Sequence, residues 1–148
     1  MGSSEDLVGG QSSLGKWLAV ALIVIGIPAF LLTDFALEKA QKIVIDNEKK
    51  SWAGTLQHAI AVGYSTKFDH RKAAERYEWA ARYAFFAGEQ EEGAWLLFNQ
   101  AVEVEAADSN GKWAALPMYE KLASDYADKP VGARAAGNVT RITTMARP

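Results

Sequence analysis

The chain has 148 residues, 49% of them hydrophobic and 23% charged, a composition typical of one compact domain with an appendage and unlike that of a disordered or fibrous protein. Sixteen basic residues against 18 acidic ones give a net charge of −2 at pH 7, which argues against a dedicated nucleic-acid-binding protein. The sequence contains no cysteine, which excludes disulfides, iron–sulfur clusters, cysteine-ligated zinc and a thiol nucleophile.

An uncharged and strongly apolar run covers residues 17–33, between Lys16 and Asp34. As a helix it would be about 25 Å long, which is close to the thickness of the hydrocarbon core of a bilayer. Residues 35–37 continue the apolar stretch, so we expect a transmembrane helix over residues 17–37 behind a short polar tail of residues 1–16. The side chains expected to anchor the chain in the lipid bilayer are Trp17, Leu22, Ile25, Pro28, Phe30 and Leu32.

A cleaved signal peptide and a buried core helix are the two alternatives for this run. A signal peptide begins with basic residues, whereas residues 1–15 contain Glu5 and Asp6 and no Lys or Arg, and no A-x-A cleavage pattern follows the run. A core helix would show a polar face, and this run has none. The sequence therefore favours an uncleaved anchor.

Two arguments about the orientation of the span in the membrane disagree. Lysines are more numerous after the span than before it, which by the positive-inside rule places the C-terminal part in the cytoplasm. A long following domain, here residues 34–148, is translocated largely regardless of its flanking charge. By analogy with single-span bacterial proteins of this layout, we expect a protein of the bacterial inner membrane with its C-terminal domain in the periplasm.

The residues after the span predict a helical extension. Residues 34–50 are rich in helix formers, with Ala36, Ala40 and Ile43 on one stripe. We expect the span to continue as a juxtamembrane stalk over residues 38–63, ahead of a connector in which Asp69 caps the next helix. The expected apolar face of the second piece of the stalk consists of Trp52, Leu56, Ala59, Ile60 and Gly63.

Four further helices are expected over residues 70–87, 89–106, 112–127 and 131–146. Gly88 is typical of the residue just after a helix. The expected buried faces are Ala73, Tyr77, Ala80, Ala81 and Ala84; Ala94, Leu97, Phe98, Ala101 and Val102; Ala115, Met118, Tyr119, Leu122 and Tyr126; and Gly132, Ala135, Val139, Ile142 and Ala146.

The connections between these helices are short, which predicts antiparallel hairpins. Two hairpins can stack as a small right-handed solenoid or close as a bundle, and the sequence leaves both open. Pro117 indicates that the third helix either begins near Leu116 or is kinked there.

Two stretches resemble tetratricopeptide repeat proteins. Ala94, Phe98 and Ala101 follow Gly88 with the small–aromatic–small spacing of the second helix of such a repeat, and residues 119–130 (YEKLASDYADKP) are similar to helix ends in periplasmic members. With the anchor, the layout resembles the YfgM-type ancillary factors of the bacterial secretion translocon. The resemblance implies an all-α protein: one transmembrane helix extended as a stalk, then a tetratricopeptide-like array of antiparallel hairpins over residues 64–148.

Motifs of catalysis and cofactor binding are missing from the sequence, which has no GxGxxG, GxxxxGK[ST], HExxH or GxSxG. His58 and His70 lie in different segments and are interpreted as surface residues. The acidic run of residues 89–92 is interpreted as the first turn of a helix, where negative charge is favourable. We therefore expect a non-catalytic protein with no cofactor, no metal and no small-molecule substrate.

Aromatic residues and segregated charge give the best indication of a protein partner. Trp79 lies two residues after Tyr77, so the two side chains cannot share one face of a helix, and one of them has to point away from the core. Residues 89–108 carry acids and no Lys or Arg, while residues 129–148 carry the reverse, which fits either docking surfaces or two helices that face each other. The candidate partner-interface residues are Trp79, Phe85, Trp95, Trp113, Arg134 and Arg141.

These observations lead to one preferred function and two alternatives. The preferred function is a non-catalytic accessory subunit of a larger integral membrane complex, for which photosynthetic or respiratory complexes are the examples with many small single-span subunits. The first alternative is a membrane-anchored chaperone-like or assembly factor at a secretion translocon, and the second is an enzyme with an unrecognised site. The partners expected are subunits of a membrane complex and the lipid bilayer, without nucleic acid.

Overall fold

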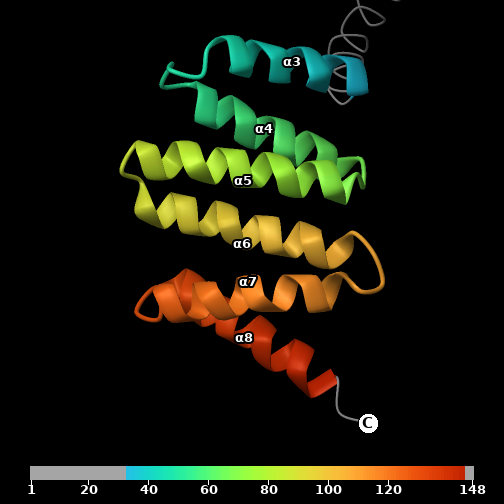
Figure 1. The fold of residues 1–148 in the computed structure, drawn as a ribbon, viewed down its shortest axis with the longest axis vertical. Coiled ribbons are helices and arrows are strands. Elements are labelled where there is room, and N and C mark those ends of the chain that lie inside the picture. The colour runs from blue at the N-terminus through green and yellow to red at the C-terminus, as the bar shows by residue number, and fades with distance from the viewer. Residues whose placement is uncertain (1–32, 146–148) are drawn as a thin grey trace, which may run out of the picture.

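The computed structural model describes residues 33–145, which fold as six α-helices stacked in chain order without a β-strand in that range (Figure 1). The all-α class expected from the sequence is confirmed for this part of the chain. The helices are α3 (Asp34–Asp46), α4 (Ala53–Thr66), α5 (His70–Phe86), α6 (Gln90–Ala106), α7 (Gly111–Asp125) and α8 (Pro130–Met145).

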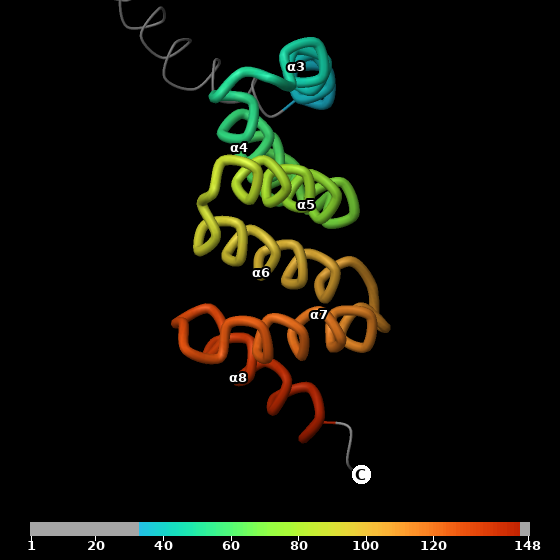
Figure 2. Tube along the Cα trace, turned by 60° about the vertical axis from the view of Figure 1, so that its left-hand side comes forward, coloured from blue at the N-terminus to red at the C-terminus, as the bar shows by residue number. Residues whose placement is uncertain are grey.

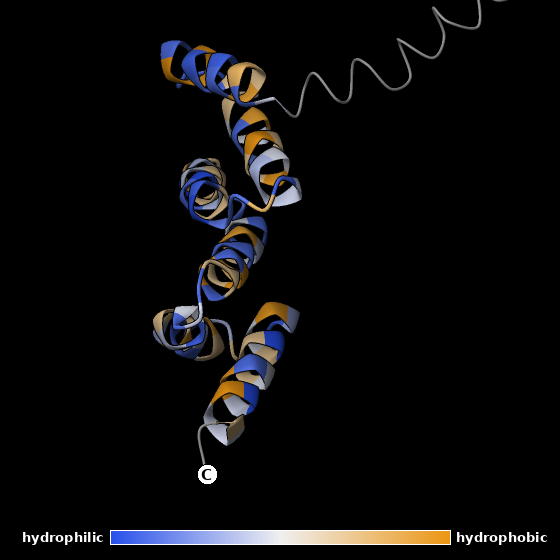
Figure 3. Ribbon diagram, turned by 90° about the vertical axis from the view of Figure 1, so that its right-hand side faces the viewer, coloured by the Kyte–Doolittle hydropathy of each residue, from blue (hydrophilic) through white to orange (hydrophobic). Residues whose placement is uncertain are grey.

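Successive helices run antiparallel and are joined by short turns, so that α3 and α8 lie at opposite ends of an open stack (Figures 1 and 2). Figure 3, which views the stack from the side, shows that the chain zigzags, with α5 and α7 on one side and α4 and α8 on the other. In addition to its neighbours in sequence, α6 contacts α8. Residues 33–145 therefore have the arrangement of a helical repeat rather than of a closed bundle.

Three apolar clusters hold the stack together, and each one joins three consecutive helices. The first joins α3, α4 and α5 around Ile60 and Tyr64, and the second joins α4, α5 and α6 around Tyr77 and Leu96. The third joins α6, α7 and α8 around Tyr119. Because α4, α5 and α6 each take part in two clusters, the stack gains stability by adding neighbours rather than by closing on itself.

The predicted face of α5 is confirmed. Ala73, Tyr77, Ala80, Ala81 and Ala84 are all buried. Four of these five residues are alanines, so α4 and α6 can approach the backbone of α5 closely from both sides. The face predicted for α6 is only partly confirmed, because α6 is covered on two sides and buries Leu96 and Glu103 against α5 while Val102 is exposed.

Two predicted helix boundaries are confirmed. The side chain of Asp69 caps α5 by accepting a hydrogen bond from the backbone N–H of Lys72 at 3.3 Å. Gly88 follows α5 with a positive φ of 84°, which glycine adopts without strain. Of the two possibilities for Pro117, the structure places it inside α7, which already begins at Gly111.

The structure differs from the expected stalk over residues 38–63. These residues form a hairpin, in which α3 packs on α4 through Leu37 and Val44. Thr33 has an extended backbone (φ −71°, ψ 149°) and its hydroxyl accepts a hydrogen bond from Ala36 N–H, so a new helix starts at Asp34 instead of continuing an earlier one. The stripe predicted for this helix was displaced: Ile43 is exposed, and the next residue, Val44, is buried.

The face predicted for α4 is only partly confirmed. Ile60 and Gly63 are buried as predicted, but Trp52 and Ala59 are exposed. The buried residues that were not predicted are Ala53, Gln57 and Ala61. The reason is that α4 is covered by α3 on one side and by α5 on the other, so its buried surface is wider than one stripe and is not centred on the largest residues.

The expected anchor lies almost entirely outside the described residues. Within residues 33–145, no helix combines the length and the apolar character that crossing a bilayer requires. Residues 33–37, the end of the expected span, form the cap and first turn of α3. The polar tail (residues 1–16) and the anchoring residues Trp17, Leu22, Ile25, Pro28, Phe30 and Leu32 all lie outside the described part.

Two glycines of α8 provide a test of this packing. A methyl group at Gly132 would lie 1.9 Å from the carbonyl oxygen of Tyr126, so Gly132→Ala should lower the free energy of unfolding by about 1–3 kcal/mol. A methyl group added at Gly137 would have no such neighbour within 4 Å, so Gly137→Ala should raise the free energy of unfolding by about 0.5–1 kcal/mol. Denaturant unfolding followed by circular dichroism compares the two variants, and equal effects would contradict the packing of α8 on the preceding turn.

Candidate functional site

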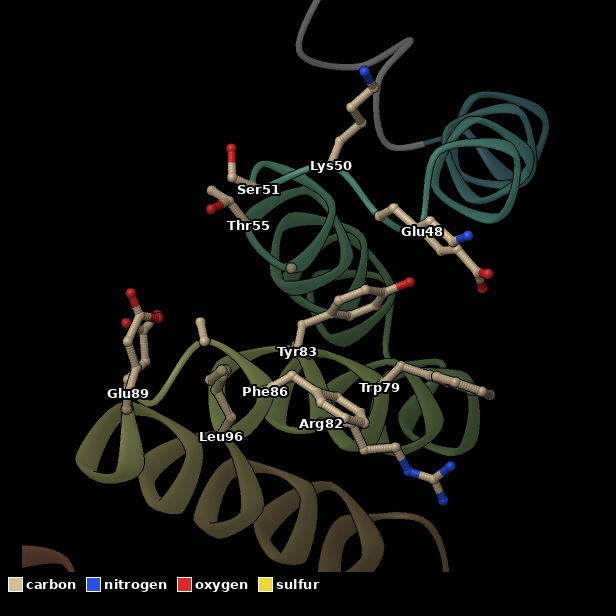
Figure 4. A pocket seen from close by; sticks show the side chains of 16 residues that line it. Glu48, Lys50, Ser51, Thr55, Trp79, Arg82, Tyr83, Phe86, Glu89 and Leu96 are labelled. Atoms are coloured by element: carbon tan, nitrogen blue, oxygen red, sulfur yellow. The ribbon is translucent and has the colours of Figure 1, made fainter.

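A groove of about 860 Å³ opens between α4 and α6, with α5 as its floor (Figure 4). Ala80, Ala84 and Leu96 provide apolar surface at the bottom. The turn between α3 and α4 borders one side of the groove, and the start of α6 borders the other. The groove follows from the zigzag, because α4 and α6 lie on the same side of α5 without packing tightly on each other.

Aromatic side chains of α5 stand at the edge of this groove. Phe86 is 93% exposed and Trp79 is 43% exposed, and both line the opening. The guanidinium of Arg82 lies 4.9 Å from the centre of the Trp79 ring and also pairs with Glu78 at 2.5 Å. Trp79 thus makes a cation–π contact within its own helix while a large part of its side chain faces solvent.

The two rims carry net charges of opposite sign. Glu48, Lys49 and Lys50 stand on the rim formed by the turn between α3 and α4, where the lysines outnumber the acid, and Glu89 and Glu92 stand on the rim formed by the start of α6. Figure 4 shows Tyr83 rising from α5 beneath the turn that carries Glu48 and Lys50. Partial burial, and then the negative charge of Glu48, raise the pKa of Tyr83 above its usual value.

The aromatic residues predicted for the partner interface do not gather on one surface. Trp79 lies in the groove, but Phe85 turns inward, and its ring covers Gly93, whose added methyl would come within 2.5 Å of it. Trp95 is half-buried and packs edge-on against Phe98, with 5.6 Å between the ring centres. Trp113 is 44% exposed, but it lies on α7, away from the groove, with Lys112 over its ring.

The two arginines predicted for the interface have different environments. Arg141 of α8 donates to both carboxylate oxygens of Glu105 on α6, each at 2.7 Å. The hydroxyl of the buried Tyr119 donates to the same carboxylate at 3.1 Å, and burial and then the Glu105 charge raise the pKa of Tyr119 well above its usual range. Arg134 is exposed, with its guanidinium 5.9 Å from the centre of the Phe98 ring. Part of the charge that the sequence segregates, acidic in residues 89–108 and basic in residues 129–148, therefore forms an ion pair between α6 and α8.

A cluster around Glu103 was missed from the sequence. This buried carboxylate accepts a hydrogen bond from the Ser65 hydroxyl at 2.6 Å, and His70 Nδ1 lies 2.7 Å from its other oxygen. His70 is therefore no simple surface residue. In a hydrolytic triad the histidine stands between the serine and the acid, whereas here the carboxylate stands between the other two, so the imidazole is not placed to take the serine proton. The cluster ties α4, α5 and α6 together.

A second buried charge connects α5 with α3. Arg76 of α5 is buried and pairs with Glu75 at 2.8 Å. The side-chain oxygen of Gln41, on α3, accepts hydrogen bonds from the two terminal nitrogens of Arg76 at 2.7 and 2.9 Å when its amide faces them. Like Glu103 and Glu105, this residue acts between helices through its terminal nitrogens, while its buried Nε has no hydrogen-bond partner in the described part of the chain.

Within residues 33–145, no three histidine or acidic side chains lie close enough together to hold a metal ion. Comparison of the chain with protein-family models, with curated proteins and with solved structures found no match. The groove with its exposed aromatics is therefore the best-supported candidate site in the described part of the chain.

Arg141 and Arg134 allow the pairing of α6 with α8 to be tested. Arg141→Ala should lower the free energy of unfolding by about 1 kcal/mol, because Glu105 then loses a partly buried cationic partner. Arg134→Ala is the matched control and should change it by less than about 0.5 kcal/mol. Chemical denaturation measures both, and a Glu105→Gln background should remove most of the Arg141 effect; an Arg141 effect that persists in that background would contradict the assignment.

Proposed function

We propose that this chain is a non-catalytic accessory subunit of a larger integral membrane complex of the bacterial inner membrane. In this proposal the uncharged segment before α3 anchors the chain as a single span, and the tetratricopeptide-like stack, placed in the periplasm, docks on the soluble face of the complex. Photosynthetic and respiratory assemblies are the kinds of complex considered. The observation that carries the proposal is the groove, in which Phe86 and Trp79 are left open to solvent.

Exposed aromatic rings of this kind favour protein binding over chemistry. Aromatic side chains that fill a partner's pocket contribute most of the binding energy in many interfaces. Phe86 gains nothing from the fold of its own chain, because almost all of its surface is exposed. By contrast, the buried carboxylate of Glu103 and the half-buried carboxylate of Glu105, which could carry acid–base chemistry, are occupied by hydrogen-bond partners from other helices.

The shape and charge of the groove indicate the form of the partner segment. Its open form between two helices suits an apolar helix, which would place its side chains on Ala80, Ala84 and Leu96. Acidic residues of that helix would face Lys49 and Lys50, and basic residues would face the opposite rim. We assign the groove to such a helix from a neighbouring subunit.

The alternative is a membrane-anchored chaperone-like or assembly factor at a secretion translocon. The zigzag of antiparallel helices supports it, because such stacks present grooves to peptide segments. The two functions differ in stoichiometry: a subunit stays with its complex in a fixed ratio after mild detergent extraction, whereas an assembly factor is recovered below that ratio.

Substitutions in the groove test the docking step. Trp79→Ala combined with Phe86→Ala should weaken retention of the membrane complex by about 30-fold or more, because two aromatic anchors are lost. Trp113→Ala is the control, since it removes an equally exposed aromatic from another surface and should leave retention unchanged. Quantitative mass spectrometry after affinity purification in mild detergent measures the subunit ratio.

Loss of docking can be distinguished from loss of folding, because the side chains of Trp79 and Phe86 contribute little to folding. If the double variant melts at the same temperature as the parent chain and still retains its complex in full, the groove is not the docking surface. If charge reversal at Lys50 (Lys50→Glu) also has no effect on retention, the assignment of an acidic partner segment on that rim fails as well.

A further inference from the structure

Two exposed phenylalanines flank one ion pair at the end of the stack where α3 begins. Lys67, in the turn between α4 and α5, pairs with Asp34 in the first turn of α3. Phe35 directly follows Asp34 and is 61% exposed, and Phe68 directly follows Lys67 and is 82% exposed. Because the ion pair joins their neighbours, the two rings lie on the same end of the molecule.

The backbone of Phe68 makes its exposure unusual. Its φ is +60°, in the left-handed region of the backbone. In most residues the β-carbon makes this region sterically unfavourable, and glycine or asparagine commonly occupies it. The ring touches His70 edge-on, with 6.1 Å between the ring centres, and is otherwise open. The large apolar side chain of Phe68 is held outward by a strained turn and makes no stabilising contact with the core. Its role therefore lies outside the described fold.

One lysine contacts the Phe35 ring, and further lysines lie nearby on α3 and α5. The Lys39 ammonium lies 5.5 Å from the centre of the Phe35 ring, and Lys42 is exposed one turn further along α3. Lys72, on α5, is half-exposed near the turn of Phe68. Aromatic rings with lysines around them are typical of protein surfaces that rest at the interface of an anionic bilayer.

The position of this end relative to the N-terminal segment identifies the partner. The uncharged run of residues 17–33 stops at Thr33, which caps α3, so Phe35 lies two residues from its end. Thr33 caps α3, so the stack begins at Asp34, directly after the run, with no further residues between them to hold the stack at a distance. If the run spans a bilayer, Phe35 and Phe68 lie at its surface.

We infer that Phe35 and Phe68 insert into the headgroup region of an anionic phospholipid bilayer beside the span and fix the tilt of the stack on the membrane. This inference rests on the proposed function, because it requires residues 17–33 to cross the bilayer. Lys39 and Lys42 then face lipid phosphates, and α8 points away from the membrane, since it lies at the other end of the stack.

Site-specific labelling of the full-length chain tests the inference, and the absence of native cysteine makes a single label possible. Phe68→Cys carrying a polarity-sensitive aromatic fluorophore is reconstituted in vesicles of phosphatidylcholine and phosphatidylglycerol. Trp113→Cys with the same label is the matched control, because it replaces an exposed aromatic on α7. We expect lipids with a shallow nitroxide to quench the label at position 68 at least about threefold more than the label at position 113.

Three results would overturn the inference, and they are distinguishable. If the chain stays in vesicles after alkaline carbonate washing but the label at position 68 remains in water, the lipid contact fails while the anchor stands. If carbonate removes the chain, the anchor and the lipid contact both fail. If the label is shielded only when the purified membrane complex is present, the two rings contact protein instead of lipid.

A second variant separates lipid contact from folding. Phe68→Gly removes the ring at a backbone conformation that glycine accepts freely, so the melting temperature should not fall. With a label at the neighbouring exposed position (Thr66→Cys), the quenching by shallow nitroxide lipids should decrease at least about twofold in the Phe68→Gly background. Unchanged quenching would show that Phe68 does not insert.

Discussion

The close approach of α4 and α6 to the alanine-rich helix α5 is the constraint on which the rest of the stack depends. Small side chains at Ala73, Ala80, Ala81 and Ala84 let α5 serve as a shared wall for both neighbours. The same small side chains make the floor of the groove, since Ala80 and Ala84 also line it. Larger residues there would push α4 and α6 outward and fill the groove at the same time.

Polar groups that are hydrogen-bonded between helices determine the angle between successive helices of the zigzag. Glu103 joins three successive helices, Glu105 joins α6 to α8, and Arg76 reaches Gln41 on α3. All three residues reach a helix that is not a neighbour in sequence, and apolar packing between consecutive helices does not fix such contacts. Charged groups are costly to bury without a partner, so these pairs favour one angle of the zigzag over others.

Local features of the fold could be predicted, whereas features made by several helices could not. The face of α5, the Asp69 cap and the glycine after α5 depend on residues close in sequence, and all three are confirmed. The role of Glu103 depends on Ser65 and His70, which other helices supply. The α3–α4 hairpin was missed because a helical stripe does not reveal which neighbour covers it, and the groove exists only once three helices are placed.

The opposite charges on the two rims of the groove have a consequence for the polarity of whatever binds there. A helix has a partial positive charge at its N-terminus and a partial negative charge at its C-terminus. A helical segment seated across the groove is therefore more stable with its carboxyl end toward Lys49 and Lys50 and its amino end toward Glu89 and Glu92. The groove would thus favour one direction of the bound helix, and the same helix bound in the opposite direction would be less stable.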